Sequence, residues 1–153
     1  MTTILVSLLD PLKVKGLTLR YRIVMPPMNT ELATRSGAVT DRLIRHYVKR
    51  SKALGLLIVE HSYVSLQGKL SERQLGIHDD SLIPGLKKLV QSIHVAGTVI
   101  GAQINHAGAR AAEEITGAPL VAPSPAEGVH ELQVKEIEDL TRIFATAAER
   151  AIK

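Results

Sequence analysis

The stretch Leu56-Leu57-Ile58-Val59 decides the class of fold, because its apolar residues follow one another without alternation. Strands that are buried on both faces have this pattern, and such strands usually belong to parallel sheets. Val99-Ile100-Gly101-Ala102-Gln103-Ile104 is a second run of this kind. Ile23-Val24-Met25 is a third, and Pro26-Pro27 ends it because proline has no backbone donor for a sheet. The sequence therefore predicts three strands of a parallel sheet.

Helical periodicity fills the intervals after these strands. Thr40 is a predicted N-cap, and the apolar residues that follow it recur at helical spacing as far as Gly55, which we expect to end the helix. A second helix is predicted from Leu82 to Gly97, and a third runs from about Ile137 to the end of the chain. The residues from 105 to 132, which include three prolines, are expected to form one long loop.

A small β-hairpin precedes the first strand, since the residues from Leu12 to Arg20 alternate between apolar and polar on both sides of Gly16. The predicted order is then a hairpin and three β–α units. This order indicates a parallel α/β protein, either a doubly wound sheet or a (β/α)-barrel. Right-handed crossovers between sequential strands would place all three helices on one face. We therefore expect the other face to be uncovered, and further strands to be needed to complete the sheet.

Composition narrows the class of protein. The chain has 153 residues, which we assign to one domain over 1–153, with no cysteine and a net charge of +4. Without cysteine there are no disulfides, thiolate metal sites or iron–sulfur clusters. The apolar run Ile4–Leu9 is too short for a membrane span and has no basic start, so we expect no membrane partner and a cytoplasmic location.

A basic stripe lies on the first predicted helix, where Arg42, Arg45, Lys49 and Lys52 share one side. It is interpreted as a solvated helix face or, alternatively, as a docking surface. No aromatic residues lie among these charges, so the sequence does not indicate a nucleic-acid partner.

Polar residues follow each predicted strand at its carboxyl end, where parallel α/β folds form their sites. They lie in the segments 26–31, 60–63 and 103–110. Gln103 stands out, because its strand is otherwise apolar and a buried amide needs hydrogen-bond partners. A glutamine that only caps a loop is the alternative.

The histidines suggest a metal site as a minor hypothesis. His61 and His106 would lie at neighbouring strand ends, with His78 in a nearby loop. None of them has a local ligand spacing such as H-x-x-x-H, so we assign no metal. No glycine-rich dinucleotide or phosphate motif follows any strand.

Four stretches together resemble one family. They are Leu12–Met28, Gly55–Glu60, Leu75–Asp80 and Ile100–Arg110. In order and spacing they are similar to the old yellow enzyme family, the NADH:flavin oxidoreductases. The resemblance implies an FMN-containing TIM barrel whose bottom is closed by an N-terminal hairpin. The chain would then be an α/β protein with the N-terminal part of a (β/α)8 barrel, about three of its eight β–α units.

The resemblance also implies roles for particular residues. Pro27, Met28 and Asn29 would lie along the flavin, with the Asn29 side chain near the reactive edge. His61 would contact the flavin through its backbone, and Gln103 would bind the pyrimidine part of the ring. His106 and Arg110 would belong to the loop that lines the site.

The implied reaction passes hydride from NADH or NADPH through FMN to an activated alkene or another small-molecule acceptor. Asn29 replaces a frequent threonine or cysteine, and His61 is bulkier than the usual residue. The residues that hold the substrate are expected after a fourth strand, so no catalytic residue is assigned.

Two hypotheses about the chain remain open. In the first, the chain is the N-terminal part of an oxidoreductase. A complementary C-terminal half-barrel chain completes it, or it self-associates through its open strand edges. Alternatively, it is a catalytically inactive truncated product or an assembly subunit without tight flavin binding.

Overall fold

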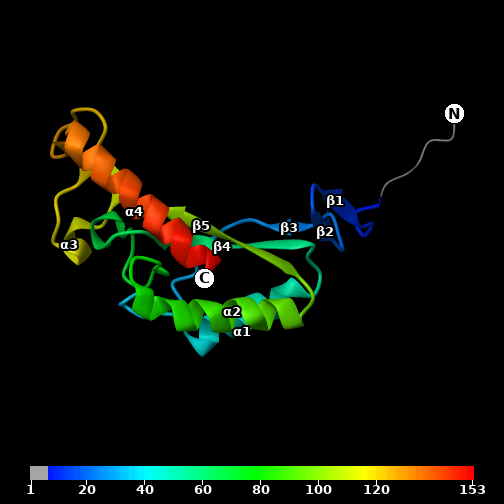
Figure 1. Cartoon of the computed structure of the whole chain (residues 1–153). Coiled ribbons are helices and arrows are strands. Elements are labelled where there is room, and N and C mark those ends of the chain that lie inside the picture. The colour runs from blue at the N-terminus through cyan, green and yellow to red at the C-terminus, as the bar shows by residue number, and fades with distance from the viewer. Residues whose placement is uncertain (1–6) are drawn as a thin grey trace, which may run out of the picture.

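The computed structural model describes residues 7–153, so the start of the apolar run Ile4–Leu9 lies outside the described residues. The predicted hairpin is confirmed. Strands β1 (Leu12–Val14) and β2 (Leu17–Leu19) pair in antiparallel fashion, with Lys15 at a φ of 52° in the turn. The hairpin lies beyond one end of the main sheet, on the side of the N-terminus (Figure 1).

The predicted parallel sheet is also confirmed. It has the order β3 (Val24–Met25), β4 (Leu56–Tyr63) and β5 (Val99–Asn105), with parallel pairing throughout. Strand β4 continues past the apolar run that predicted it. The pairing register shifts between Val59 and Ser62, so two residues of β4, Glu60 and His61, lie opposite Gln103 alone. Such a bulge bends the strand and redirects its side chains, and this one lies near the carboxyl end of the sheet.

Three long helices follow the strands: α1 (Asp41–Ser51), α2 (Ile83–Val95) and α4 (Val134–Ile152). Thr40 is the N-cap of α1, because its hydroxyl accepts a hydrogen bond from the Leu43 N–H at 3.1 Å. Short 3-10 turns, η1 (Leu66–Gly68) and η2 (Asp80–Leu82), lie between β4 and α2. Gly97 has a φ of 79° just after α2, which is the conformation expected of a glycine that ends a helix.

The role predicted for Gly55 was wrong. Helix α1 ends at Ser51, and Gly55 has no left-handed conformation. Its N–H instead donates to the Ile23 carbonyl at 2.9 Å, at the start of the sheet. A Cβ on Gly55 would lie 1.8 Å from the carbonyl oxygen of Tyr21. Glycine is needed here because two backbones approach closely.

The main core lies between the sheet and the first two helices. Leu57 and Val59 of β4 are buried against α1 and α2. The other buried members of this core are Ala33, Leu43, Tyr47, Leu54, Leu75, Leu89 and Ile93. Helices α1 and α2 run side by side below the sheet in Figure 1.

Helix α4 joins a second, smaller core, in which Ala147 packs against Val64 and Ile77. Arg150 also donates to Asp80 at 2.6 Å, which ties the helix to the turn before α2. Both α2 and the end of α4 border Ile100 and Ala102 of β5. The helices therefore share one face of the sheet, as right-handed crossovers require.

The segment from 105 to 132 is not one unstructured loop. It contains η3 (Gly108–Arg110), α3 (Glu113–Thr116) and a short parallel pair, β6 (Val121–Ala122) with β7 (His130–Glu131). These elements are too short to show a periodicity, so the sequence pattern could not indicate them.

The opposite face of the sheet is uncovered. Leu56 and Ile58 are only half-buried, whereas their neighbours Leu57 and Val59 are buried. Within the described part of the chain the sheet is not closed into a barrel, and β3 and β5 are its edges. Among residues 7–153, no helix is long and apolar enough to cross a membrane.

Candidate functional site

The carboxyl ends of the parallel strands bring the segment after β3 next to the end of β4. Glu60 is fully buried at the bulge, and its carboxylate accepts hydrogen bonds from the Thr30 N–H and, at 2.9 Å, from the Thr30 hydroxyl. Burial raises the pKa of Glu60, the hydrogen bonds from Thr30 oppose this rise, and the nearby Glu31 adds to it. Glu60 thereby fixes the backbone next to Asn29.

A second carboxylate holds the other side of the same segment. Glu31, at a φ of 55°, accepts from the Asn29 amide at 2.7 Å, from the Arg73 N–H at 3.0 Å and from the Ser71 hydroxyl. Burial acts to raise the pKa of Glu31, but hydrogen bonds from Ser71, Asn29 and Arg73 outweigh it and lower the pKa. Asn29 is thus held by an ionised carboxylate and stays exposed beside the exposed Met28.

The side chain of His61 is held by a glutamine from the loop that precedes α2. Gln74 is fully buried, and its amide nitrogen lies 2.7 Å from His61 Nδ1, 3.1 Å from the His61 carbonyl and 3.2 Å from Asn105 Oδ1. Because the amide nitrogen donates, Nδ1 of a neutral His61 is the acceptor and Nε2 carries the proton. Gln74 also accepts from the Leu70 N–H at 2.7 Å, and so it links β4, β5 and this loop.

His106 packs against the turn η1. A Cβ on Gly68 would lie 2.3 Å from the His106 ring, so the glycine leaves the space that the ring fills. The Gly108 N–H donates to His106 Nδ1 at 3.1 Å, which leaves the proton of the neutral ring on Nε2. Nε2 is buried and has no hydrogen-bond partner among the described residues. Burial lowers the pKa of His106, which favours the neutral ring.

Gln103 was predicted to be a buried amide, and this prediction was wrong. The residue is exposed, and its side chain makes no hydrogen bond within residues 7–153. The reason is that β5 presents Gln103 at the uncovered carboxyl end of the sheet, next to the bulge. A loop-capping role finds no support either. Arg110 is exposed in η3 and is likewise free of ion pairs in the described part of the chain.

The three histidines of the metal hypothesis do not converge. His61 bonds to Gln74, His106 packs on Gly68, and His78 stacks on Tyr63 with ring centroids 4.7 Å apart. Within residues 7–153, no group of three or more His, Asp or Glu residues could hold a metal ion. The three histidines therefore do not form a shared ligand set among the described residues.

Sequence reasoning missed Gln74 and the contacts that support the site. Thr30 and Glu31 belong to the polar segment 26–31 that was expected at the site, but loop residues have no periodic pattern that would indicate their hydrogen bonds. Glu60 did carry a signal, since it directly follows an apolar strand run and a buried carboxyl needs partners.

With this geometry in place, the comparisons with known proteins identify the class. Residues 7–153 match the sequence profile of the NADH:flavin oxidoreductase / NADH oxidase family. The chain belongs to this family.

Curated relatives agree in sequence. An NADH oxidase of Thermoanaerobacter brockii is 40% identical over 148 residues, which cover 91% of this chain and 23% of that protein. An NADPH dehydrogenase of Listeria monocytogenes is 36% identical over 153 residues, which cover 95% of this chain and 44% of the relative. The chain thus spans less than half the length of these relatives.

Solved structures show the same fold. The old yellow enzyme homologue of Zymomonas mobilis superposes with a TM-score of 0.88 at 29% identity, over 95% of this chain and 45% of that one. The Old Yellow Enzyme of a Pichia species gives a TM-score of 0.88 at 27% identity, over 95% and 42%. The described sheet, helices and hairpin therefore form part of a TIM barrel, as the resemblance implied.

FMN is the cofactor that the family implies, and the exposed residues of the site fit a flavin. Gln103 has a free amide that can both donate and accept, as the pyrimidine edge of a flavin requires. Gly101 lies on the same strand, and a Cβ there would meet nothing within 4 Å, so a ring could approach the open face. Met28 adds an exposed apolar surface.

Proposed function

We propose that the chain supplies the N-terminal part of an FMN-dependent NAD(P)H oxidoreductase that reduces an activated alkene or another small-molecule acceptor. The observation that carries this proposal is the free Gln103 amide at the carboxyl end of a sheet that belongs to the flavin oxidoreductase family. When bound, FMN would supply the hydride-transfer chemistry, and the protein would bind and orient it.

The chain's own residues would then divide the work of binding. Gln103 would hold the pyrimidine edge, the segment Pro27-Met28-Asn29 would line the ring, and the backbone of His61 would contact it. Glu60 and Glu31 would fix that segment from both sides through Thr30 and Asn29. His106 and Arg110 would border the entrance.

Completion of the sheet is part of the proposal. Strands β3 and β5 have unpaired edges, and the face that carries Leu56 and Ile58 is uncovered. At about 25 cal/mol per Å², covering such side chains is worth several kcal/mol. We propose that a complementary C-terminal half-barrel pairs with these edges and supplies the remaining residues of the flavin and substrate sites.

The experiment titrates FMN into the chain alone and into the chain co-purified with the C-terminal remainder of the Listeria NADPH dehydrogenase. Binding is measured by the quenching of flavin fluorescence. We expect weak binding alone, tighter binding with the complement, and a loss of at least about tenfold in affinity for Gln103→Ala, since two hydrogen bonds are removed. Gln91→Ala, at an exposed position of α2, is the matched control. Unchanged binding by Gln103→Ala would contradict the assignment of Gln103.

The second candidate is an inactive product or an assembly subunit without tight flavin binding. It is favoured by the exposure of the carboxyl end of the sheet, which leaves any bound ring open to water. A protein that stays colourless and takes up no FMN, with or without the complement, would decide for it.

A further inference from the structure

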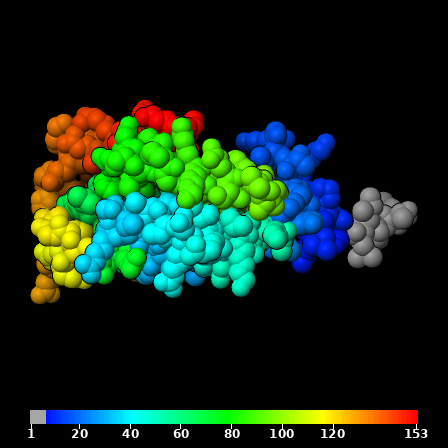
Figure 2. Space-filling model, turned by 90° about the horizontal axis from the view of Figure 1, so that it is seen from below, coloured from blue at the N-terminus to red at the C-terminus, as the bar shows by residue number. Residues whose placement is uncertain are grey.

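A groove between α1 and α2 lies on the outside of the molecule, away from the proposed flavin site. It has a volume of about 750 Å³, and Ile44, Val48 and Val95 give it an apolar floor. Val95 is 91% exposed. Figure 2 shows this face, with α1 in cyan and α2 in green side by side.

The rim of the groove is strongly basic. We call this surface the basic face; its cations are Arg45, Lys49, Lys52 and Lys88. Asp41 is the one acidic residue within α1 and α2, and it pairs with Lys88 at 2.8 Å. The other three cations, Arg45, Lys49 and Lys52, have no carboxylate partner in the part of the chain that the structure describes. The basic face therefore has both the charge and the exposed apolar surface to receive an acidic, amphipathic element.

An element of this kind is present elsewhere in the same molecule. Residues 113–139, here called the acidic end, contain a single Lys or Arg, Lys135, and seven acidic residues: Glu113, Glu114, Glu127, Glu131, Glu136, Glu138 and Asp139. They form α3, the β6–β7 pair and the start of α4, which gather at one end of the molecule, far from the hairpin (Figures 1 and 2).

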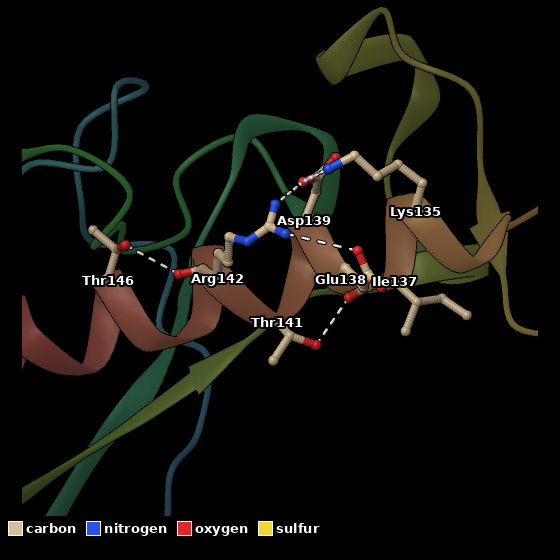
Figure 3. Close-up of polar contacts among 7 residues, drawn as sticks. All are labelled: Lys135, Ile137, Glu138, Asp139, Thr141, Arg142 and Thr146. Carbon is tan, nitrogen blue, oxygen red and sulfur yellow. Dashed lines mark hydrogen bonds and ion pairs between the residues drawn. The ribbon is translucent and has the colours of Figure 1, made fainter.

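The first turns of α4 add apolar surface to this charge. Val134 is 75% exposed and Ile137 is 43% exposed. Arg142 pairs with Asp139 and, at 3.7 Å, with Glu138, and Lys135 pairs with Asp139 at 3.3 Å (Figure 3). Glu131 has no ion pair among the described residues, so the acidic end keeps an excess of negative charge.

We propose that the basic face binds the acidic end of a second copy of this chain, with the start of α4 seated in the groove between α1 and α2. Charge complementarity selects this occupant, because both surfaces belong to the same protein and carry opposite excess charge. The apolar residues match as well, since Val134 and Ile137 would cover Ile44, Val48 and Val95.

The contact joins two different surfaces, so it is head-to-tail and leaves one free surface at each end of the pair. Such a contact builds open chains unless its rotation closes a ring. It involves the outer surfaces of helices and not the strand edges. It therefore does not depend on the proposed flavin function or on completion of the sheet. Exposed charge pairs are weak and screened by salt, so the association is weak and salt-dependent.

The test uses sedimentation velocity of the full chain over a range of concentrations, in about 20 mM and about 300 mM NaCl, which span weak and strong screening. One variant is Arg45→Glu with Lys49→Glu on the basic face. The other is Glu131→Lys with Glu138→Lys at the acidic end. The control, Lys13→Glu with Lys15→Glu in the hairpin, has the same net charge as the first variant, 4 − 4 = 0.

We expect the wild type and the control to associate in low salt, with the average mass rising above 16.6 kDa with concentration and falling in high salt. Each of the other two variants alone should lose this salt-sensitive association by at least about tenfold, because the basic face with Asp41 changes from 4 − 1 = +3 to −1, or residues 131–139 change from 1 − 4 = −3 to +1, and attraction then becomes repulsion. An equal mixture of the two should regain it, because the unchanged acidic end of the first variant then meets the unchanged basic face of the second. Association that ignores salt, that survives in either variant alone, or that fails to return in the mixture would overturn the proposal.

Discussion

Gln74 offers the sharpest test of how the site is held together. It is fully buried; its carbonyl oxygen accepts from the Leu70 N–H, and its two amide N–H groups lie within reach of three acceptors on His61 and Asn105. Gln74→Leu keeps a similar volume and removes every one of these hydrogen bonds. We expect it to destabilise the fold and to loosen His61 at the same time.

The magnitude follows from the groups left without partners. Each unsatisfied buried polar group costs about 1–3 kcal/mol. The Leu70 N–H and the His61 carbonyl are two such groups, so the expected loss is about 2–6 kcal/mol out of a stability of about 5–15 kcal/mol for a domain of this size. At roughly 2–4 °C for each kcal/mol, the melting temperature should fall by about 10 °C.

The assay is urea and thermal unfolding followed by circular dichroism, with Gln91→Leu on the exposed side of α2 as control. Gln74→Glu is the second variant, because it keeps the acceptor for the Leu70 N–H and removes the donors to His61 and Asn105. It should be destabilised at least as much as Gln74→Leu at pH 7, because a buried carboxylate would face the His61 carbonyl and Asn105 Oδ1, which are both acceptors. A Gln74→Leu protein that melts within about 2 °C of the wild type, a shift worth under 1 kcal/mol, would refute this account of the link between β4, β5 and the loop.

Three further predictions follow from the same geometry. Gly55→Ala should lower the free energy of unfolding, measured in urea, by at least about 3 kcal/mol, because its Cβ would lie 1.8 Å from the Tyr21 carbonyl oxygen. The control is Gly16→Ala, whose Cβ would meet nothing within 4 Å, and it should change the free energy of unfolding by less than about 1 kcal/mol. Burial raises the pKa of Glu60 above its ordinary 4.5, so the folded protein binds this proton more tightly than the unfolded chain does. The wild type should therefore lose stability as the pH rises above 4.5 through the raised pKa. That component should be missing from the stability curve of Glu60→Gln, and identical pH dependence of the two proteins would contradict it. His106 has a pKa lowered by burial below its ordinary 6.5, so its contribution is present above pH 6.5 and is lost as pH falls through the lowered pKa. Subtracting the stability curve of His106→Gln from that of the wild type should show this loss, and a flat difference between pH 4 and pH 7 would count against a buried neutral ring.

Much of the fold was predictable because its signals are local. Continuous apolar runs indicated β4 and β5, and the Thr40 cap and the glycine at 97 marked helix ends that the structure confirms. Gly55 was misinterpreted for the opposite reason. A glycine is required at position 55 because the carbonyl of Tyr21, which is distant in sequence, lies close to it in space.

The site was predictable only in part. Strand order and polarity correctly indicated which segments meet at the carboxyl end of the sheet. The burial of their side chains was not predictable, as Gln103 and Glu60 show. Gln103 was expected to be buried and is exposed, whereas the carboxyl of Glu60 is completely enclosed. The bulge at Glu60 and His61 turns the Glu60 side chain into the core and leaves no trace in the hydrophobic pattern, whereas Gln103 is exposed because β5 is an edge strand with an uncovered face.

The amino-acid sequence by itself determined the parallel α/β class, the hairpin, the order of strands and helices, and the family. These properties rest on periodicity, turn chemistry and motif spacing, which are all carried by residues close together along the chain. The tertiary structure alone decided the clamps on Thr30 and Asn29, the position of His61 on Gln74 and the separation of the basic face from the acidic end. Each of these depends on side chains that the fold brings together from distant segments, and a contact of that kind has no period for a sequence to reveal.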